Sequence, residues 1–113
     1  MKSSRLIIPL KTKVLFDKTF NSKKLVKNNV YLIKYLINNL PTTRFAIAVG
    51  KKYFKHATLR NRIRRQIRSM LAVLCAKPID LIVIVNPKYL EQSFATNKAM
   101  ITNLYNSINI NVN

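Results

Sequence analysis

The chain has 113 residues, which is enough for one domain and too few for two. Its 21 lysines and arginines face three acidic residues and give a net charge of +18, so most of the counter-anions must come from outside the chain. An apolar share of 49% supplies a core, and a single cysteine, Cys75, excludes an internal disulfide. No apolar run approaches the roughly 20 residues that a membrane-spanning helix needs, and the N-terminus lacks the pattern of a signal peptide.

The first part of the chain is basic and then helical. Residues 1–11 show no periodicity, and we interpret them as a flexible N-terminal arm of one domain that spans residues 1–113. Thr12 is a suitable N-cap for a short helix that runs to about Phe20, with Phe16 four residues earlier on the same face. The polar, lysine-rich residues that follow, 21–28, favour a loop.

Two strands are predicted next. Residues 29–37 alternate with a period of two, which places Tyr31 and Tyr35 on one face and Lys34 on the other, as in a half-buried strand. Residues 44–50 alternate in the same way and form the second predicted strand.

The period becomes helical near Thr58, a plausible N-cap, because apolar residues recur at spacings of three and four from Leu59 onward. Pro78 is expected to end this helix. Residues 80–85 form a continuous apolar run that is typical of a central strand buried on both faces. A final amphipathic helix is predicted over residues 92–108. The order α-β-β-α-β-α indicates an α/β (α+β) two-layer sandwich with a small mixed sheet.

Positive charge is densest over residues 51–68, where eight of eighteen residues are cationic and none is acidic. On the predicted helix Arg64, Arg65 and Arg68 lie opposite the apolar stripe, together with Asn61, and Arg60 and Arg62 flank it. Like charges four residues apart destabilise a helix by about 0.2–0.5 kcal/mol per pair. Guanidinium groups bind phosphates bidentately and stack on bases. This pattern predicts a nucleic-acid-binding face, and a solvated basic face without a partner is the alternative. The predicted contact residues are Lys51, Lys52, Lys55, Arg60, Asn61, Arg62, Arg64, Arg65 and Arg68.

The sequence contains no recognisable catalytic constellation. His56 is the one histidine, and it lies in a basic loop without a neighbouring carboxylate, so we expect it at the surface or in contact with RNA. Asp17 and Glu91 would form a pair only if folding brought them together. Neither a Cys/His cluster for zinc nor a glycine-rich phosphate loop occurs. We therefore predict no catalytic residue and no metal ligand on this chain.

Residues 44–71, RFAIAVGKKYFKHATLRNRIRRQIRSML, resemble the signature of the bacterial ribonuclease P protein component. The family has an apolar strand that ends in a Val-x-Lys-Lys turn, a short loop, and Arg-Asn-Arg followed by Ile, a basic pair and an Ile-Arg step. Phe16 and Phe20 match its early Phe-x-x-x-Phe helix, and residues 80–87 match its late apolar strand leading to a proline. The resemblance covers about residues 6–108. Gly50 departs from it, since many members have Ser or Ala there. The matching signature residues are Val49, Lys51, Lys52, Arg60, Asn61, Arg62, Ile63, Arg64, Arg65, Ile67 and Arg68.

The resemblance implies the RNA-binding subunit of an endoribonuclease that removes the 5′ leader from precursor tRNA. It places the catalytic centre and its Mg²⁺ ions on the RNA subunit, so the protein alone would bind no cofactor. The charge and the missing membrane and signal segments indicate a cytoplasmic protein. The resemblance implies a protein that is monomeric within a 1:1 holoenzyme and whose partners are the ribonuclease P RNA subunit and precursor tRNA. It also implies a left-handed βαβ crossover, against the usual hand.

In the family, the Arg-Asn-Arg helix contacts the RNA subunit, and a cleft between the sheet and the first helix receives the single-stranded leader. Single-stranded RNA needs flat rings for stacking and cations along its backbone. Phe20 and Tyr35 are alternatively core residues, whereas Phe16 and one strand tyrosine are expected to be exposed. The predicted leader-contact residues are Phe16, Phe20, Tyr31, Lys34 and Tyr35.

Three other classes remain open. A structural ribosomal protein of similar size and charge would cosediment with a ribosomal subunit and leave tRNA processing unaffected. A general RNA chaperone and a membrane-surface peptide are the others.

Overall fold

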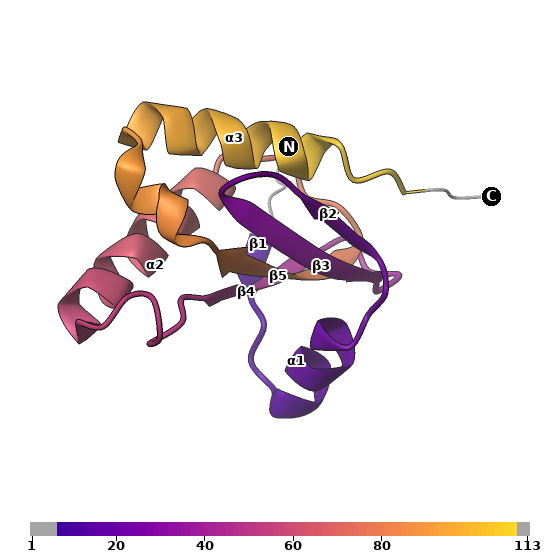
Figure 1. The fold of residues 1–113 in the computed structure, drawn as a ribbon. Coiled ribbons are helices and arrows are strands. Elements are labelled where there is room, and N and C mark those ends of the chain that lie inside the picture. The colour runs from indigo at the N-terminus through magenta and orange to yellow at the C-terminus, as the bar shows by residue number, and fades with distance from the viewer. Residues whose placement is uncertain (1–6, 111–113) are drawn as a thin grey trace.

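A computed structural model describes residues 7–110 of the chain (Figure 1). Most of the predicted N-terminal arm, residues 1–6, lies outside this range. In chain order the elements are β1 (Ile7–Pro9), α1 (Lys13–Phe20), β2 (Leu25–Lys27), β3 (Tyr31–Ile37), β4 (Thr43–Ala48), α2 (Ala57–Leu71), β5 (Ile79–Val85), the 3₁₀ helix η1 (Pro87–Glu91) and α3 (Phe94–Asn106).

The strands form one mixed sheet in the order β1-β4-β5-β3-β2. β5 lies in the middle, parallel to β4 and antiparallel to β3. Six of its seven residues are buried, including the neighbours Leu81 and Ile82, which point to opposite faces. The prediction of a central strand buried on both faces is confirmed. The β4–α2–β5 connection joins adjacent parallel strands. That this crossover is left-handed stays a prediction.

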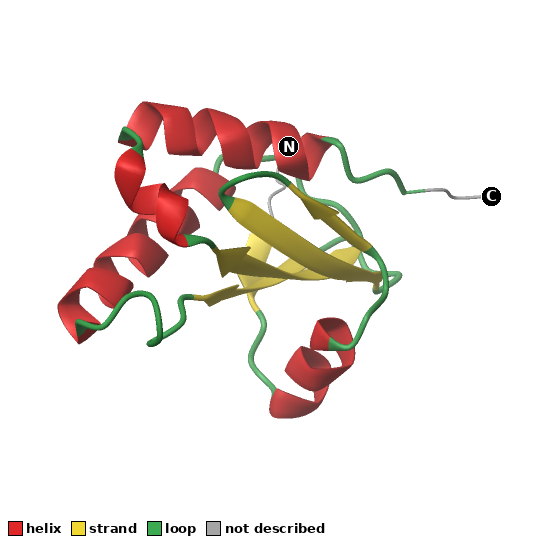
Figure 2. Ribbon diagram, viewed as in Figure 1, coloured by secondary structure: helices red, strands yellow, loops and turns green. Residues whose placement is uncertain are grey.

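The main core lies between the sheet and the two longer helices, α2 and α3, as Figure 2 shows. Alternate residues of the central strands face this core because successive side chains of a strand point to opposite faces. α2 and α3 close it with the apolar stripes that the helical periodicity predicted. The core residues of the sheet and of these two helices include Tyr31, Ile33, Phe45, Leu81, Val83, Ile63, Ile67, Met70, Leu71, Ile101, Leu104 and Tyr105.

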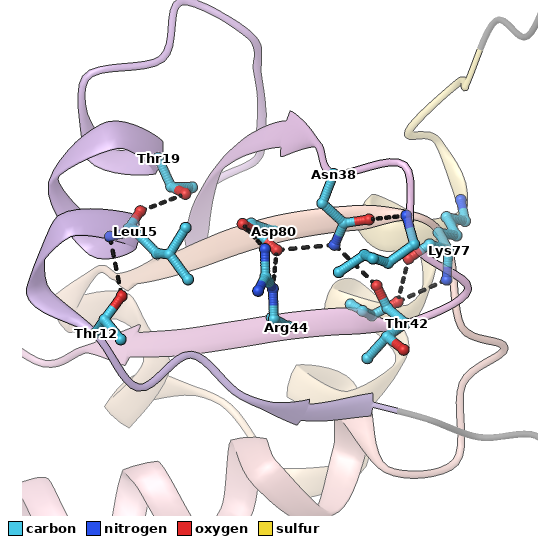
Figure 3. Close-up of polar contacts among 10 residues, drawn as sticks. Thr12, Leu15, Thr19, Asn38, Thr42, Arg44, Lys77 and Asp80 are labelled. Carbon is cyan, nitrogen blue, oxygen red and sulfur yellow. Dashed lines mark hydrogen bonds and ion pairs between the residues drawn. The ribbon is translucent and has the colours of Figure 1, made fainter.

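The short helix α1 packs against β3 and β5 on the side of the sheet away from α3 (Figure 1). Its N-cap is Thr12, whose Oγ1 accepts a hydrogen bond from the Leu15 amide at 3.3 Å, as predicted (Figure 3). The α+β class and the mixed sheet are confirmed. A two-layer sandwich has helices on one face of the sheet only. Here α1 also covers part of the opposite face.

Two short edge strands and both ends of α2 differ from the sequence-based expectations. β1 and β2 were not predicted, and β2 lies where a loop was expected. α2 begins after His56, which supplies no side-chain cap, so the prediction of Thr58 as N-cap is wrong. α2 ends at Leu71, well before Pro78, because the chain must turn early for Lys77 to reach β4, where its amide donates to Thr43 Oγ1 at 2.6 Å.

A partly buried ion pair links β4 to β5 on the face of the sheet that α1 partly covers. Arg44 Nε and Nη2 donate to the two carboxylate oxygens of Asp80 at 2.7 and 2.9 Å. Asn38 Nδ2 donates to the same carboxylate at 2.8 Å (Figure 3). An exposed pair, Lys13 with Asp17 at 2.8 Å, lies on α1. Two of the three acidic residues are therefore neutralised by partners within the chain.

Candidate nucleic-acid interface

One face of α2 is buried and the opposite face carries exposed arginines. Ile63 and Ile67 are fully buried against the core. Arg62, Arg65 and Arg68 are exposed on the other side. The predicted separation of the apolar stripe from the arginines is confirmed. We call the exposed side with Arg62, Arg65 and Arg68 the arginine face.

Two other arginines of α2 are already bound within the chain. Arg60 Nη1 donates to the carbonyl oxygens of Phe54 and Lys55 at 2.8 and 3.0 Å. Arg64 Nη1 donates to Asn61 Oδ1 at 3.2 Å. Arg60 therefore holds the preceding loop against the helix, a structural function that its place in the Arg-Asn-Arg motif did not reveal.

The remaining arginines have unused donors. Within residues 7–110, the guanidinium groups of Arg62, Arg65 and Arg68 donate no hydrogen bond to another residue. Arg62 and Arg65 border an open hollow at the start of α2, together with His56 and Asn61. This hollow combines a cationic rim with an amide and an imidazole, all of which suit phosphate and base edges.

The turn before α2 presents lysines around a buried anchor. Lys51, Lys52 and Lys55 are exposed, whereas Phe54 between them is fully buried. Tyr53 is 58% exposed, and Lys52 Nζ lies 5.7 Å from its ring centroid. Tyr53 was not predicted as a site residue, although an aromatic ring within a lysine turn is a signal for nucleic-acid binding.

On the opposite face of the sheet, three of the predicted leader-contact residues come together. The rings of Phe16 and Phe20 stack with centroids 5.9 Å apart and an interplanar angle of 11°. Lys34 Nζ lies 4.5 Å from the Phe20 ring centroid and donates to the Phe20 carbonyl oxygen at 2.9 Å. Phe20 is 42% exposed and Phe16 is half-buried, so the expectation that Phe16 is the exposed ring is wrong, and Phe20 offers the aromatic surface beside the cation.

The two predicted tyrosines do not join this cluster. Tyr31 is 1% exposed in the main core, and its hydroxyl donates to the Asn97 carbonyl oxygen at 2.9 Å. Burial raises the pKa of the Tyr31 hydroxyl. Tyr35 is half-buried and packs against the same core. The prediction that the Tyr31 ring contacts RNA is therefore wrong. Side chains alternate along β3, so Lys34 points to the face that α1 covers, whereas Tyr31 and Tyr35 point to the opposite face.

A second hollow extends the face that carries Lys34. It is lined by Leu32 and Ile84, which are paired across β3 and β5, and by other residues that include Tyr53, Lys27 and Asn86. Leu32 has the same pleat as Lys34, so the hollow lies on the α1 side of the sheet. Apart from Tyr31, whose side chain lies in the core, none of its lining residues was predicted from the sequence.

The chain offers little to a metal ion in the part that the structure describes. No three His, Cys, Asp or Glu side chains gather there. Asp17 and Asp80 are each bound to a cationic side chain. In the same part of the chain, no helix is both long enough and apolar enough to cross a membrane.

Comparison with known proteins shows one consistent similarity. The sequence model of the family described as Ribonuclease P matches residues 8–109. A ribonuclease P protein component from Ureaplasma parvum is 36% identical over 81 residues, which cover 70% of this chain and 72% of that protein. One from Mycoplasma capricolum is 32% identical over 112 residues, 96% of this chain and 99% of that protein.

Solved structures agree on the fold. The RNase P protein from Thermotoga maritima superimposes with a TM-score of 0.77 at 22% identity, over 89% of this chain and 97% of that one. The RNase P protein from Staphylococcus aureus gives a TM-score of 0.74 at 23% identity, over 87% of this chain and 92% of that one.

Proposed function

The chain belongs to the ribonuclease P protein family, and we propose that it binds the catalytic RNA of a ribonuclease P holoenzyme through α2 and the 5′ leader of precursor tRNA through the sheet face beside α1. It acts as one protein bound to one RNA. The product is the mature 5′ end of tRNA.

The observation that carries this proposal is the arginine face of α2. Arg62, Arg65 and Arg68 are exposed and without internal partners in residues 7–110, on a helix whose other face is fully buried. Arginine binds phosphate bidentately, and each phosphate contact releases condensed counterions from the RNA. A rigid helix that presents three such groups suits a folded RNA.

The leader is a single strand, and the opposite face suits a single strand. The stacked Phe16 and Phe20 rings and Lys34 provide stacking surface and positive charge. The hollow lined by Leu32 and Ile84 continues the same face toward Tyr53. Tyr53 therefore takes the role that was predicted for a strand tyrosine.

The chemistry of cleavage belongs to the RNA subunit in this proposal. Mg²⁺ held by that RNA would activate the attacking water and stabilise the leaving oxygen. The side chains of this protein bind and orient the two RNAs. Two of its three carboxylates, Asp17 and Asp80, are bound to Lys13 and Arg44.

Reconstitution tests the proposal directly. The purified chain is added to a bacterial ribonuclease P RNA at low Mg²⁺, and cleavage of a precursor tRNA is measured against the RNA alone. We expect strong stimulation, and its absence would refute the proposal. A ribosomal protein would instead cosediment with a ribosomal subunit, and a general chaperone would act equally on an unrelated structured RNA.

A further inference from the structure

A third hollow lies on the other side of Arg62, between α2 and the segment that leads into α3. Figure 1 shows η1 and the start of α3 passing beside α2. The hollow is formed mainly by side chains from these three elements and the turn between η1 and α3. Its lining includes Arg62, Gln66, Tyr89, Leu90, Gln92 and Phe94.

Two large apolar side chains of this hollow are open to solvent. Leu90 is 48% exposed and Phe94 is 46% exposed. Both line the same concave hollow. An exposed ring at a concave site provides a stacking surface for a flat ligand.

The hollow also contains one unused donor and one unused acceptor. Tyr89 Oη donates to Gln66 Oε1 at 2.7 Å, which fixes the Gln66 amide and leaves its Nε2 donors free within residues 7–110. Gln92 Nε2 donates to Asn97 Oδ1 at 3.0 Å and to Met100 Sδ at 3.3 Å, so Gln92 Oε1 has no partner in the same residues. A nucleobase edge offers a complementary acceptor and donor.

Arg62 connects this hollow to the arginine face. The same side chain lines the hollow at the start of α2 with Arg65, and the hollow that contains Phe94. An RNA whose phosphates lie on Arg62 therefore has a nucleotide within reach of Phe94.

We propose that the hollow between α2 and α3 binds one unpaired nucleobase of the RNA that occupies the arginine face. The base stacks on Phe94, its edge bonds to Gln66 and Gln92, and its phosphate binds Arg62. This inference rests on the proposed function, because the RNA concerned is the ribonuclease P RNA.

The first test is the affinity of the protein for ribonuclease P RNA at several salt concentrations. Phe94→Leu keeps an apolar side chain but removes the flat ring. We expect it to weaken binding about 5- to 150-fold, since a stacked base contributes about 1–3 kcal/mol. The salt slope should stay that of the wild type because every phosphate remains bound. Phe94→Tyr should bind like the wild type, and Val73→Ala, an exposed site just beyond α2, is the matched control.

The second test is chemical modification of Watson–Crick edges on the bound RNA. The wild type should protect one unpaired base, and Phe94→Leu should lose that protection while the others persist. If the wild type does not bind the RNA, the proposed function fails. If it binds and Phe94→Leu binds equally well with an unchanged modification pattern, only the base-binding hollow is refuted.

Sedimentation of the protein without RNA tests whether a second copy of the chain occupies the hollow instead. We expect the same molar mass for wild type and Phe94→Leu. A wild-type dimer that Phe94→Leu disrupts would assign the hollow to a second copy of the chain and overturn the inference.

Discussion

Lys34 and Phe20 are joined twice, by a 2.9 Å hydrogen bond from Lys34 Nζ to the Phe20 carbonyl oxygen and by a 4.5 Å approach of the same ammonium group to the ring centroid. The two contacts attach the C-terminal end of α1 to β3. A cation near a helix C-terminus also interacts favourably with the helix dipole. The aromatic pair on α1 is thereby held at a fixed place over the sheet.

Replacement of Phe16 tests this aromatic pair. We expect Phe16→Ala to weaken binding of precursor tRNA by about 1–3 kcal/mol, the contribution of one stacked base, with a smaller effect on mature tRNA, which has no leader. Val14→Ala on the same helix is the control, since Val14 is exposed. Affinities of the reconstituted holoenzyme for the two tRNAs provide the measurement. Equal losses for both would contradict leader binding at Phe16.

Replacement of Arg65 and Arg68 tests the arginine face. We expect the double variant Arg65→Ala with Arg68→Ala to weaken assembly with the ribonuclease P RNA. The log–log salt slope should fall by about 0.7–0.9 for each phosphate that the variant no longer binds. Lys18→Ala on α1 should leave the slope unchanged, because that exposed lysine lies on the other side of the sheet from α2. A weaker affinity with an unaltered slope would mean that neither arginine contacts phosphate.

The Arg44–Asp80 pair makes a prediction about stability. Asp80→Asn leaves the partly buried Arg44 guanidinium without its counter-charge. We expect the free energy of unfolding to fall by about 3 kcal/mol, at the low end for such pairs because Arg44 retains some solvent. Arg44→Met combined with Asp80→Leu removes both charges and should lose less than Asp80→Asn alone. Urea denaturation measures all three, and a larger loss in the double variant would show that the pair is stabilising in itself.

Tyr89 gives the chain a predicted weakness at alkaline pH. Burial raises the pKa of its hydroxyl to about 12. Between the unfolded value near 10 and this folded value, the unfolded chain has lost the proton and the folded chain retains it. The contribution of Tyr89 to the free energy of unfolding is therefore fully present below about pH 10. It falls by up to about 1.4 kcal/mol per pH unit as the pH rises toward 12.

Tyr89→Phe isolates this effect. We expect the variant to be about 1 kcal/mol less stable at pH 7, because the bond to Gln66 is removed, and to lose stability less steeply above pH 10. Tyr31 and Tyr105, whose pKa values are also raised by burial, remain in both proteins. Urea denaturation from pH 7 to about 11.5 gives the slopes. Equal slopes would assign the alkaline loss to groups other than Tyr89.

The sequence predicts the long elements of this fold because each carries an extended apolar pattern, either periodic or continuous. α2 and β5 are examples, with a helical stripe and a continuous apolar run. β1 and β2 have three residues each and lie at the edges of the sheet, so no period can develop in them. β1 pairs with β4, which lies far away in the sequence, and β2 pairs with β3, which follows it. Neither short strand therefore shows its pairing in its own residues.

The sequence predicts which residue types form the candidate interface, but it does not predict which face of the sheet each side chain lies on. Alternation along β3 groups Tyr31 with Tyr35 and separates them from Lys34, yet it does not say which face α1 covers. That choice is made by the packing of α1, and it places Tyr31 in the core. Likewise, the Arg-Asn-Arg motif does not distinguish Arg60, which binds loop carbonyls, from Arg62, which has free donors.

The bonds from Arg60 to the Phe54 and Lys55 carbonyl oxygens have a consequence for association. Together with the buried Phe54 ring, they fold the lysine turn onto α2 before any RNA arrives. A segment that is already ordered loses little conformational entropy on binding, and more of the interaction free energy then appears as affinity. The basic segment of this chain is therefore a preorganised surface, in contrast to the many basic segments that fold only on their RNA.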